Sequence, residues 1–478
     1  MAAYSNWPEE EIYYGSEYPE LLSEPPLRDG QMIIPADSEV WHDGHWRYSF
    51  LQTWECLSGT FESLLPLMGR SIAFSMAQRI VWMCGFNERI CSVLIGALGL
   101  LLLWSNSSAI FHLYAFILYF CISTATLFLV KRSPHKGHYV ALVTFIYTVL
   151  TQFYSTDVEF MAFRGSMMIA SMKQISLAYD ARGISATDLP ALVEYIFNPS
   201  TLLFGPFNTS EQYYLAKKRS QTMDVNNFVK DVMTSFKYLA ISLIFVAYSS
   251  CISDQIPFLF NEPWLEYYTT AQAFRFSHCF VCYLSLFTAL IGGFAESDVR
   301  ATDWTAIEWP RSLTEVVVFW NLPMHSFLHK YIFRKACHNF GYFAAMVSTF
   351  LASALLHGFN FQLTAVLLSL GFYAYVESTF RKQLASILSA CIESRSCGPK
   401  CTHRHKKWNF WVLAINVAFV FLNIFHLAYL GAPFQQIEAQ QHGYSWQHTL
   451  SVWAKDWRFS SHIISVIILI FSFILSLK

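Results

Sequence analysis

Long apolar stretches separated by short polar loops fill the chain after about residue 63. A helix that crosses a bilayer needs about 20 mostly apolar residues. Clear candidates for such helices are 109–130, 138–153, 236–256, 273–293, 340–357, 361–380, 408–430 and 459–477. Weaker candidates are 64–83, 90–104, 161–178 and 189–204. The pattern predicts an all-α protein, a polytopic transmembrane helical bundle of about 11 spans in which some weaker segments are re-entrant or interfacial.

The segment before the first predicted span, residues 1–62, differs from the rest of the chain. It is polar and acidic, contains several prolines, and lacks the apolar core of a cleavable signal peptide. We therefore expect a partly disordered N-terminal tail followed by one membrane domain, residues 63–478. No internal repeat is visible in that domain.

Lysine and arginine in short loops predict the orientation, because such loops are retained in the cytosol. Basic residues crowd two loops, 131–136 and 381–407, whereas loop 431–458 is rich in glutamine and histidine. The first two loops are therefore expected in the cytosol, and the third in the lumen together with the N-terminal tail. This arrangement places the C-terminus in the cytosol and requires an odd number of crossings, which agrees with the predicted eleven.

Composition supports a membrane protein and excludes soluble classes. Hydrophobic residues make up 54% of the chain and charged residues only 14%, compared with roughly a quarter charged in ordinary soluble proteins. With a formal net charge of −1 and no basic domain, the chain is not expected to bind nucleic acid. Few charges lie within the predicted spans, so a non-catalytic lipid-binding or transport protein is the less favoured alternative.

One histidine stands at the end of an apolar helix, in the stretch Ser353-Ala354-Leu355-Leu356-His357-Gly358. A glycine directly after a helix commonly adopts the left-handed conformation that ends it. His357 would then lie beside a helix break, where an imidazole with a pKa near neutrality can serve as a general base. The alternative is a histidine that only bonds a neighbouring helix. His112, His278 and His426 are equally embedded but have no motif around them.

The stretch Trp320-Asn321-Leu322-Pro323 carries a second candidate. Asn321 precedes a proline and an amphipathic run, 325–333, so its side chain could cap that helix. Its amide could instead orient a base or donate to a developing oxyanion. The sequence supports both roles about equally.

Basic residues near these candidates have two possible roles. Lys330, Arg334 and Lys335 could extend to the membrane interface or bind the phosphates of a nucleotide-bearing acyl donor. Arg164 and Lys173 flank a methionine-rich segment. Flexible methionines suit a groove for a lipid chain, although they are equally common in ordinary membrane cores.

Cysteine and histidine cluster in the basic loop 381–407. The candidate metal ligands are Cys391, Cys397, Cys401 and His403. Their C-x5-C-x3-C-x-H spacing offers four ligands for a structural zinc ion, but it matches no standard zinc pattern. A cytosolic loop disfavours disulfides, and palmitoylation is an alternative. Most of the other cysteines lie in apolar stretches and are expected to be small buried side chains.

Taken together, these stretches resemble the membrane-bound O-acyltransferase family, and within it the members that lipidate Wnt proteins. The resemblance rests on residues 163–173, Phe204-Gly205-Pro206, 311–324, 352–391, the cysteine loop and 425–431. It covers most of the chain after about residue 130. The acidic N-terminal tail departs from the family's shorter start.

The resemblance implies an endoplasmic reticulum enzyme that transfers palmitoleate from palmitoleoyl-CoA to a serine of Wnt. His357 takes the place of the family's catalytic histidine and Asn321 that of its second signature residue. Arg164, Trp320 and Ser353 are the implied pocket residues. A sister enzyme of the family with another protein or lipid acceptor is the main alternative, and the sequence specifies no oligomeric state.

Overall fold

The computed structural model describes residues 27–28, 31–32, 38–85, 88–103, 109–180, 188–253, 255–256, 263–358, 360–398, 401–434, 446–455 and 460–476. The chain divides into two compact units, Met1–Trp54 and Glu55–Lys478. The first unit contains two short antiparallel strands, β1 (Leu27–Arg28) and β2 (Gln31–Met32). Helix α1 (Ser38–Cys84) begins well before the predicted tail boundary at residue 62.

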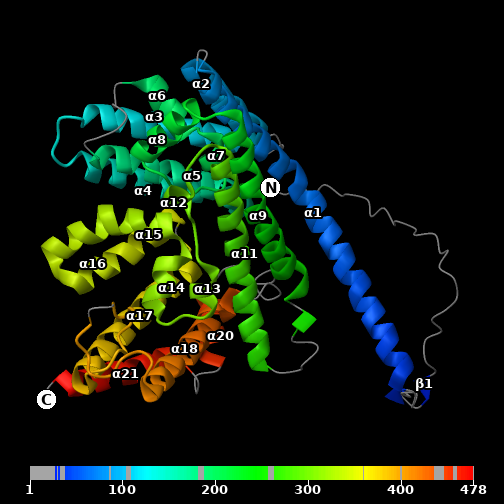
Figure 1. Ribbon diagram of the computed structural model, residues 1–478, viewed down its shortest axis with the longest axis vertical. Coiled ribbons are helices and arrows are strands. Elements are labelled where there is room, and N and C mark those ends of the chain that lie inside the picture. Colours follow the sequence, from blue (N-terminus) through cyan, green and yellow to red (C-terminus); the bar gives the residue numbers. More distant parts are fainter. Residues whose placement is uncertain are drawn as a thin grey trace, which may run out of the picture. The chain divides into compact units, whose positions relative to one another are not determined.

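The second unit is built almost entirely of helices in its described residues, which confirms the predicted all-α class (Figure 1). After α1 they are α2 (Glu88–Leu103), α3 (Ala109–Leu129), α4 (Lys136–Tyr154), α5 (Asp157–Tyr179), α6 (Leu189–Ile196), α7 (Pro199–Leu202), α8 (Ser210–Gln221), α9 (Val225–Ala247), η1 (Tyr248–Ile252), α11 (Pro263–Ile291), α12 (Glu296–Val299), α13 (Trp304–Glu308), α14 (Leu313–Trp320), α15 (Leu322–Leu328), η2 (His329–Phe333), α16 (Arg334–Leu356), α17 (Phe361–Leu388), α18 (Phe410–Gly431), η3 (Ala432–Phe434), α20 (Trp446–Lys455) and α21 (Ser461–Ser476).

Five helical stretches in the described part of the chain are long and apolar enough to cross a membrane. They are Val225–Ile252, Trp264–Ile291, Leu322–Leu356, Phe361–Leu388 and Phe410–Phe434. Shorter apolar helices cover Arg89–Gly99, Leu113–Leu129 and Ser461–Ser476. The multi-pass architecture is thus confirmed, whereas the count of eleven spans stays a prediction.

The weak candidate span 189–204 is not one continuous helix. The structure divides it into α6 and α7, which are far shorter than the roughly 20 residues that a crossing needs. Asn198 causes the break, because its side chain accepts a hydrogen bond from Ser200 N at 3.1 Å and Pro199 starts the next helix. Both short helices are largely buried in the protein.

Helix α11 joins the main parts of the second unit. It packs along α9 on one side and against α18 and α7 elsewhere (Figure 1). The contact with α18 needs a small residue, since a Cβ added to Gly431 would lie 2.4 Å from the Ala271 Cβ. Arg275 of α11 forms a buried two-point ion pair with Glu308 of α13 at 2.6 and 3.0 Å. The segment that follows α13 is therefore held against α11.

A buried ion pair between Glu377 and Arg381 fixes the start of α14. The two side chains meet at 2.8 Å on α17, and both are almost fully buried. Glu377 accepts a hydrogen bond from Leu313 N at 2.8 Å, and Arg381 donates to Arg311 O at 2.7 Å. Arg381 also donates to Asn416 Oδ1 of α18 at 2.8 Å. Since α14 ends at Trp320, this network sets the position of the segment that carries Asn321.

We expect Arg381→Met to destabilise the protein strongly, because it leaves the Glu377 carboxylate buried without its partner. Removing one partner of a buried pair typically costs about 3–5 kcal/mol. Thermal unfolding of the purified protein in detergent measures the effect, and Lys382→Met is the control because its neighbouring side chain is exposed. Equal melting temperatures for the two variants would contradict a structural role for the pair.

Candidate functional site

His357 ends helix α16, as the sequence predicts. Its backbone N–H donates to Ser353 O at 3.3 Å and Ala354 O at 3.1 Å. Gly358 follows with a φ of +87°, in the left-handed region. A Cβ at Gly358 would lie 2.5 Å from Phe160 Cε1, so only glycine fits this turn. The chain therefore breaks directly after a half-buried imidazole.

The imidazole of His357 lies among groups from two other helices. Arg164 on α5 and the titratable ring of His278 on α11 lie within electrostatic range of it. Arg164 is half-buried, and Ser353, one turn before His357 on α16, is 8% exposed. Ser353 and His357 thus lie one turn apart on α16, with Arg164 within electrostatic range of the imidazole; the pocket roles of Arg164 and Ser353 stay predictions.

His278 of α11 contacts the junction that carries Asn321. Its ring stacks on Trp320, with centroids 4.6 Å apart and planes at 11°. Its Nε2 is 2.9 Å from Trp320 O, and because a carbonyl only accepts, this nitrogen carries the proton of the neutral ring. A hydrogen bond of this kind to a neighbouring segment is also the structural alternative that the sequence allows for an embedded histidine. His278 lies within the predicted span 273–293, where ionisable groups are rare and often functional.

Asn321 lies at the junction of α14 and α15 and caps α15. Its Oδ1 accepts a hydrogen bond from Met324 N at 3.0 Å, which confirms the predicted cap. Leu322 N donates to Ala301 O at 2.8 Å and anchors the junction to the preceding loop. The cap uses Oδ1 and does not engage the two Nδ2 hydrogens. The cap therefore fixes the orientation of the Asn321 side chain, and the Nδ2 hydrogens take no part in the cap.

Lys330 borders a cavity of about 320 Å³ that begins beside Asn321. Arg300 and Lys330 contribute positive charge to the cavity, and Asp298 contributes negative charge. The full lining is Phe207, Thr209, Gln212, Ser297, Asp298, Arg300, Leu322, Pro323, Ser326, Phe327, Lys330 and Tyr331. Lys330 also pairs with Asp180 at 2.8 Å.

The other two predicted basic residues of this segment do not line the cavity. Arg334 begins α16 and is exposed, and Lys335 Nζ lies 3.2 Å from the centroid of the Tyr179 ring. Of the three cations that the sequence grouped as phosphate ligands, the structure therefore places only Lys330 at this cavity.

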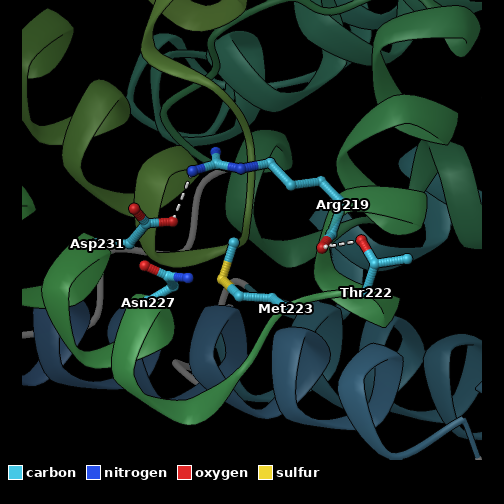
Figure 2. A pocket seen from close by; sticks show the side chains of 5 residues that line it. All are labelled: Arg219, Thr222, Met223, Asn227 and Asp231. Atoms are coloured by element: carbon cyan, nitrogen blue, oxygen red, sulfur yellow. Dashed lines mark hydrogen bonds and ion pairs between the residues drawn. The ribbon is translucent and has the colours of Figure 1, made fainter.

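A second cavity, of about 290 Å³, is lined by Arg219, Thr222, Met223, Asn227 and Asp231 (Figure 2). Asp231 pairs at 2.8 Å with both Arg219 and the fully buried Arg79. Arg79 also donates to the carbonyl groups of Leu290 and Ile291 at the end of α11. This cavity belongs to a polar joint between α1, α8, α9 and α11 and contains none of the predicted site residues.

The cysteines divide into two groups with different chemistry. Cys56 and Cys251 form a disulfide with a Cα–Cα distance of 5.8 Å, so these two are not the free apolar side chains that the sequence suggests. Cys391, Cys397, Cys401 and His403 gather as predicted, with their ligand atoms within 4.8 Å of one another. The pKa of the Cys401 thiol is lowered to about 7, chiefly by the hydrogen bond from Cys391.

Comparison with known proteins identifies the family of this chain. Residues 98–393 match the model of the membrane-bound O-acyltransferase family. The human protein-serine O-palmitoleoyltransferase porcupine is 33% identical over 437 residues, which covers 84% of this chain and 92% of the relative. The protein of the same name from Caenorhabditis briggsae is 30% identical, covering 75% of this chain and 80% of the relative. The family match includes Arg164, His278, Asn321 and His357.

Proposed function

The chain belongs to the membrane-bound O-acyltransferase family and is an acyltransferase, and we propose that it transfers a palmitoleoyl group from palmitoleoyl-CoA to a serine hydroxyl of Wnt proteins. The name of the relatives supports a serine acceptor and a palmitoleoyl donor. The acceptor protein, Wnt, follows from the sequence resemblance. One observation carries the chemical part of the proposal: His357 stands at a helix break beside Arg164 and His278.

His357 acts as the general base in this proposal. Its imidazole removes the proton of the serine hydroxyl while the serine oxygen attacks the thioester carbonyl. The tetrahedral intermediate then collapses, the C–S bond breaks, and the CoA sulfur leaves and takes the proton from His357. The imidazole returns to its neutral state, so each cycle consumes only the donor and the acceptor. Direct transfer needs no acyl-enzyme.

Asn321 stabilises the oxyanion of that intermediate. Because Oδ1 is occupied by the cap of α15, the Nδ2 hydrogens point in a fixed direction before the substrate arrives. A donor that needs no reorganisation is worth far more to a developing oxyanion than a mobile one. Asn321 can therefore cap α15 and stabilise the oxyanion at the same time, because the cap holds the amide in place.

His278 positions the Trp320–Asn321 junction. Its ring stacks on the Trp320 indole and donates to the Trp320 carbonyl, one residue before Asn321. Helix α11 holds this histidine near the middle of a membrane-spanning stretch. The reacting groups would then meet deep in the protein, where water is scarce and charge stabilisation is strong.

The donor would approach along the cavity beside α15. Arg300 and Lys330 can bind the phosphates of CoA at its edge, as arginine and lysine commonly do. Met172, Met324 and Leu356 belong to one buried apolar cluster, and in this proposal the acyl chain lies against it. Flexible methionines can adapt to an unsaturated chain.

The disulfide supports the orientation that we propose for an endoplasmic reticulum membrane. Disulfides persist in the oxidising lumen and are rare in the cytosol. Cys56 near the start of the membrane domain and Cys251 at the end of α9 would therefore be lumenal. The basic helix α8 precedes α9 and lies at its opposite end, which agrees with a cytosolic location for Lys217, Lys218 and Arg219.

The test of the function uses purified protein, palmitoleoyl-CoA and a Wnt-derived hairpin peptide. Losing a general base should lower the rate of transfer to serine by roughly 10²–10⁴-fold in His357→Ala. His338→Ala is the control, since that histidine is exposed at the far end of α16. A fully active His357→Ala would refute the mechanism. If the wild type acylates a different acceptor but not the Wnt peptide, the sister-enzyme alternative replaces the Wnt assignment.

Asn321→Asp separates catalysis from capping. Aspartate retains the cap, because its oxygen still accepts from Met324 N, but it removes the Nδ2 donor. We expect an unchanged melting temperature and a loss of about 10²–10³-fold in kcat. Asn360→Asp is the matched control, since Asn360 Oδ1 caps α17 through Leu363 N at the same distance of 3.0 Å. Near-normal turnover by Asn321→Asp would assign Asn321 to capping alone.

His278→Phe retains the aromatic stack on Trp320 but removes the hydrogen bond to its carbonyl. One neutral hydrogen bond is worth about 1 kcal/mol, so we expect kcat to fall about five- to tenfold with KM little changed. His278→Gln, which can again donate to the carbonyl, should recover part of the loss. A raised KM with normal kcat, or no recovery in His278→Gln, would argue against a positioning role.

A further inference from the structure

Four ligand atoms converge on the loop between α17 and α18. Cys391 Sγ lies 3.4 Å from Cys401 Sγ and 3.8 Å from His403 Nδ1, and Cys397 Sγ lies 3.5 Å from the same nitrogen. In a tetrahedral zinc site the sulfur and nitrogen ligands lie about 2.3 and 2.0–2.1 Å from the metal. These bond lengths place the ligand atoms roughly 3.5–3.8 Å apart, close to the separations observed here. We propose that Cys391, Cys397, Cys401 and His403 bind one structural Zn²⁺ ion.

The donor set favours zinc over other common ions. Calcium and magnesium prefer oxygen ligands, whereas three thiolates and an imidazole form a usual structural zinc set. Four protein ligands complete a tetrahedral shell and leave no position for water or substrate. Binding converts three thiols to thiolates and releases their protons to solvent. The ion therefore serves the fold and takes no part in acyl transfer.

The backbone of the loop holds the ligands in place. Ser389 ends α17 in the left-handed conformation, with a φ of +46°. Cys391 N then donates to His405 O at 3.0 Å, and His405 N donates to Ser389 O at 2.9 Å. These two bonds place the first and last ligands on adjacent stretches of chain. They form an isolated parallel bridge between Ala390 and His405, which closes the loop at its base.

Groups around the cluster fit a bound cation. Glu393 Oε1 lies 3.9 Å from His403 Nε2, the ring nitrogen that does not face the cysteines. A carboxylate in this position is a common partner of zinc-binding histidines and fixes the ring orientation. Lys406 Nζ lies 3.4 Å from Cys401 Sγ and can stabilise its thiolate.

The loop is bonded directly to the network that fixes α14. Cys391 O accepts hydrogen bonds from Arg311 at 3.3 Å and from Asn416 at 3.2 Å. Arg381 donates to Ile392 O at 2.7 Å and to Glu393 O at 3.2 Å. By holding these carbonyl groups in place, the ion would stabilise the base of the helix that ends at Trp320. The cytosolic loop would thus help to support the candidate site.

Metal analysis of the full chain tests the proposal without an activity assay. After purification in detergent and metal-free buffer, elemental mass spectrometry should find about one zinc per wild-type chain. His403→Ala and Cys397→Ser should lose most of it. His405→Ala is the matched control, because its ring packs on Trp411, with centroids 5.0 Å apart, and is not among the four ligands. Cys337→Ser controls for loss of a thiol elsewhere.

Cobalt substitution provides a second readout if a variant fails to fold. Wild-type protein stripped by a chelator and given Co²⁺ should show the visible absorption bands of tetrahedral cobalt bound to thiolates. No zinc in the wild type, normal zinc in His403→Ala and Cys397→Ser, or a mapped Cys391–Cys401 disulfide would each overturn the proposal. Because no outcome depends on acyl transfer, the zinc site and the proposed function can fail separately.

Discussion

The Glu377–Arg381 pair is the interaction on which the candidate site most depends. It is buried between α17, α18 and the start of α14, and each charge satisfies backbone groups as well as its partner. A buried pair of this kind is a modest source of net stability but is costly to break. Its importance therefore lies in fixing where α14 starts. Because α14 is only eight residues long, a fixed start also fixes where Trp320 and Asn321 lie at its other end.

The same junction is fixed from the other side by α11. Arg275 holds α13 through Glu308, and His278, one turn along the same face, holds the Trp320 carbonyl. In the proposed mechanism His357, at the end of α16, meets this junction. The proposed site would then combine the ends of two helices with the middle of another.

The sequence predicted the helical class, the helix end at His357 and the cap at Asn321, because each depends on a local rule. Apolar runs, a glycine after a histidine and an asparagine before a proline are visible within a few residues. The contact of His278 with Trp320 could not be predicted, because its stack and hydrogen bond join residues 42 positions apart. The Cys56–Cys251 disulfide, with a sequence separation of 195, was missed for the same reason.

Other differences arose from competition between local signals. The stretch 189–204 has the composition of a short span, yet Asn198 and Pro199 break it into two helices. Both α6 and α7 are buried against other helices, so their apolar side chains are covered by protein. Lys330 pairs with Asp180 and Lys335 lies over the Tyr179 ring, whereas Arg334 is exposed, because residues 330–335 cover more than one full helical turn. The spacing of the three residues in the sequence shows that they lie on one segment, but it does not show which of them lines the cavity.

The central claim is that the thioester meets His357 and Asn321 at one point inside the membrane domain. A structure of the protein with a non-hydrolysable palmitoleoyl-CoA analogue tests it most directly. We predict that the carbonyl oxygen of the analogue lies about 3 Å from Asn321 Nδ2, with its phosphates near Arg300 and Lys330. An analogue bound instead at the cavity between Arg219 and Asp231, or with its carbonyl far from His357, would contradict the account.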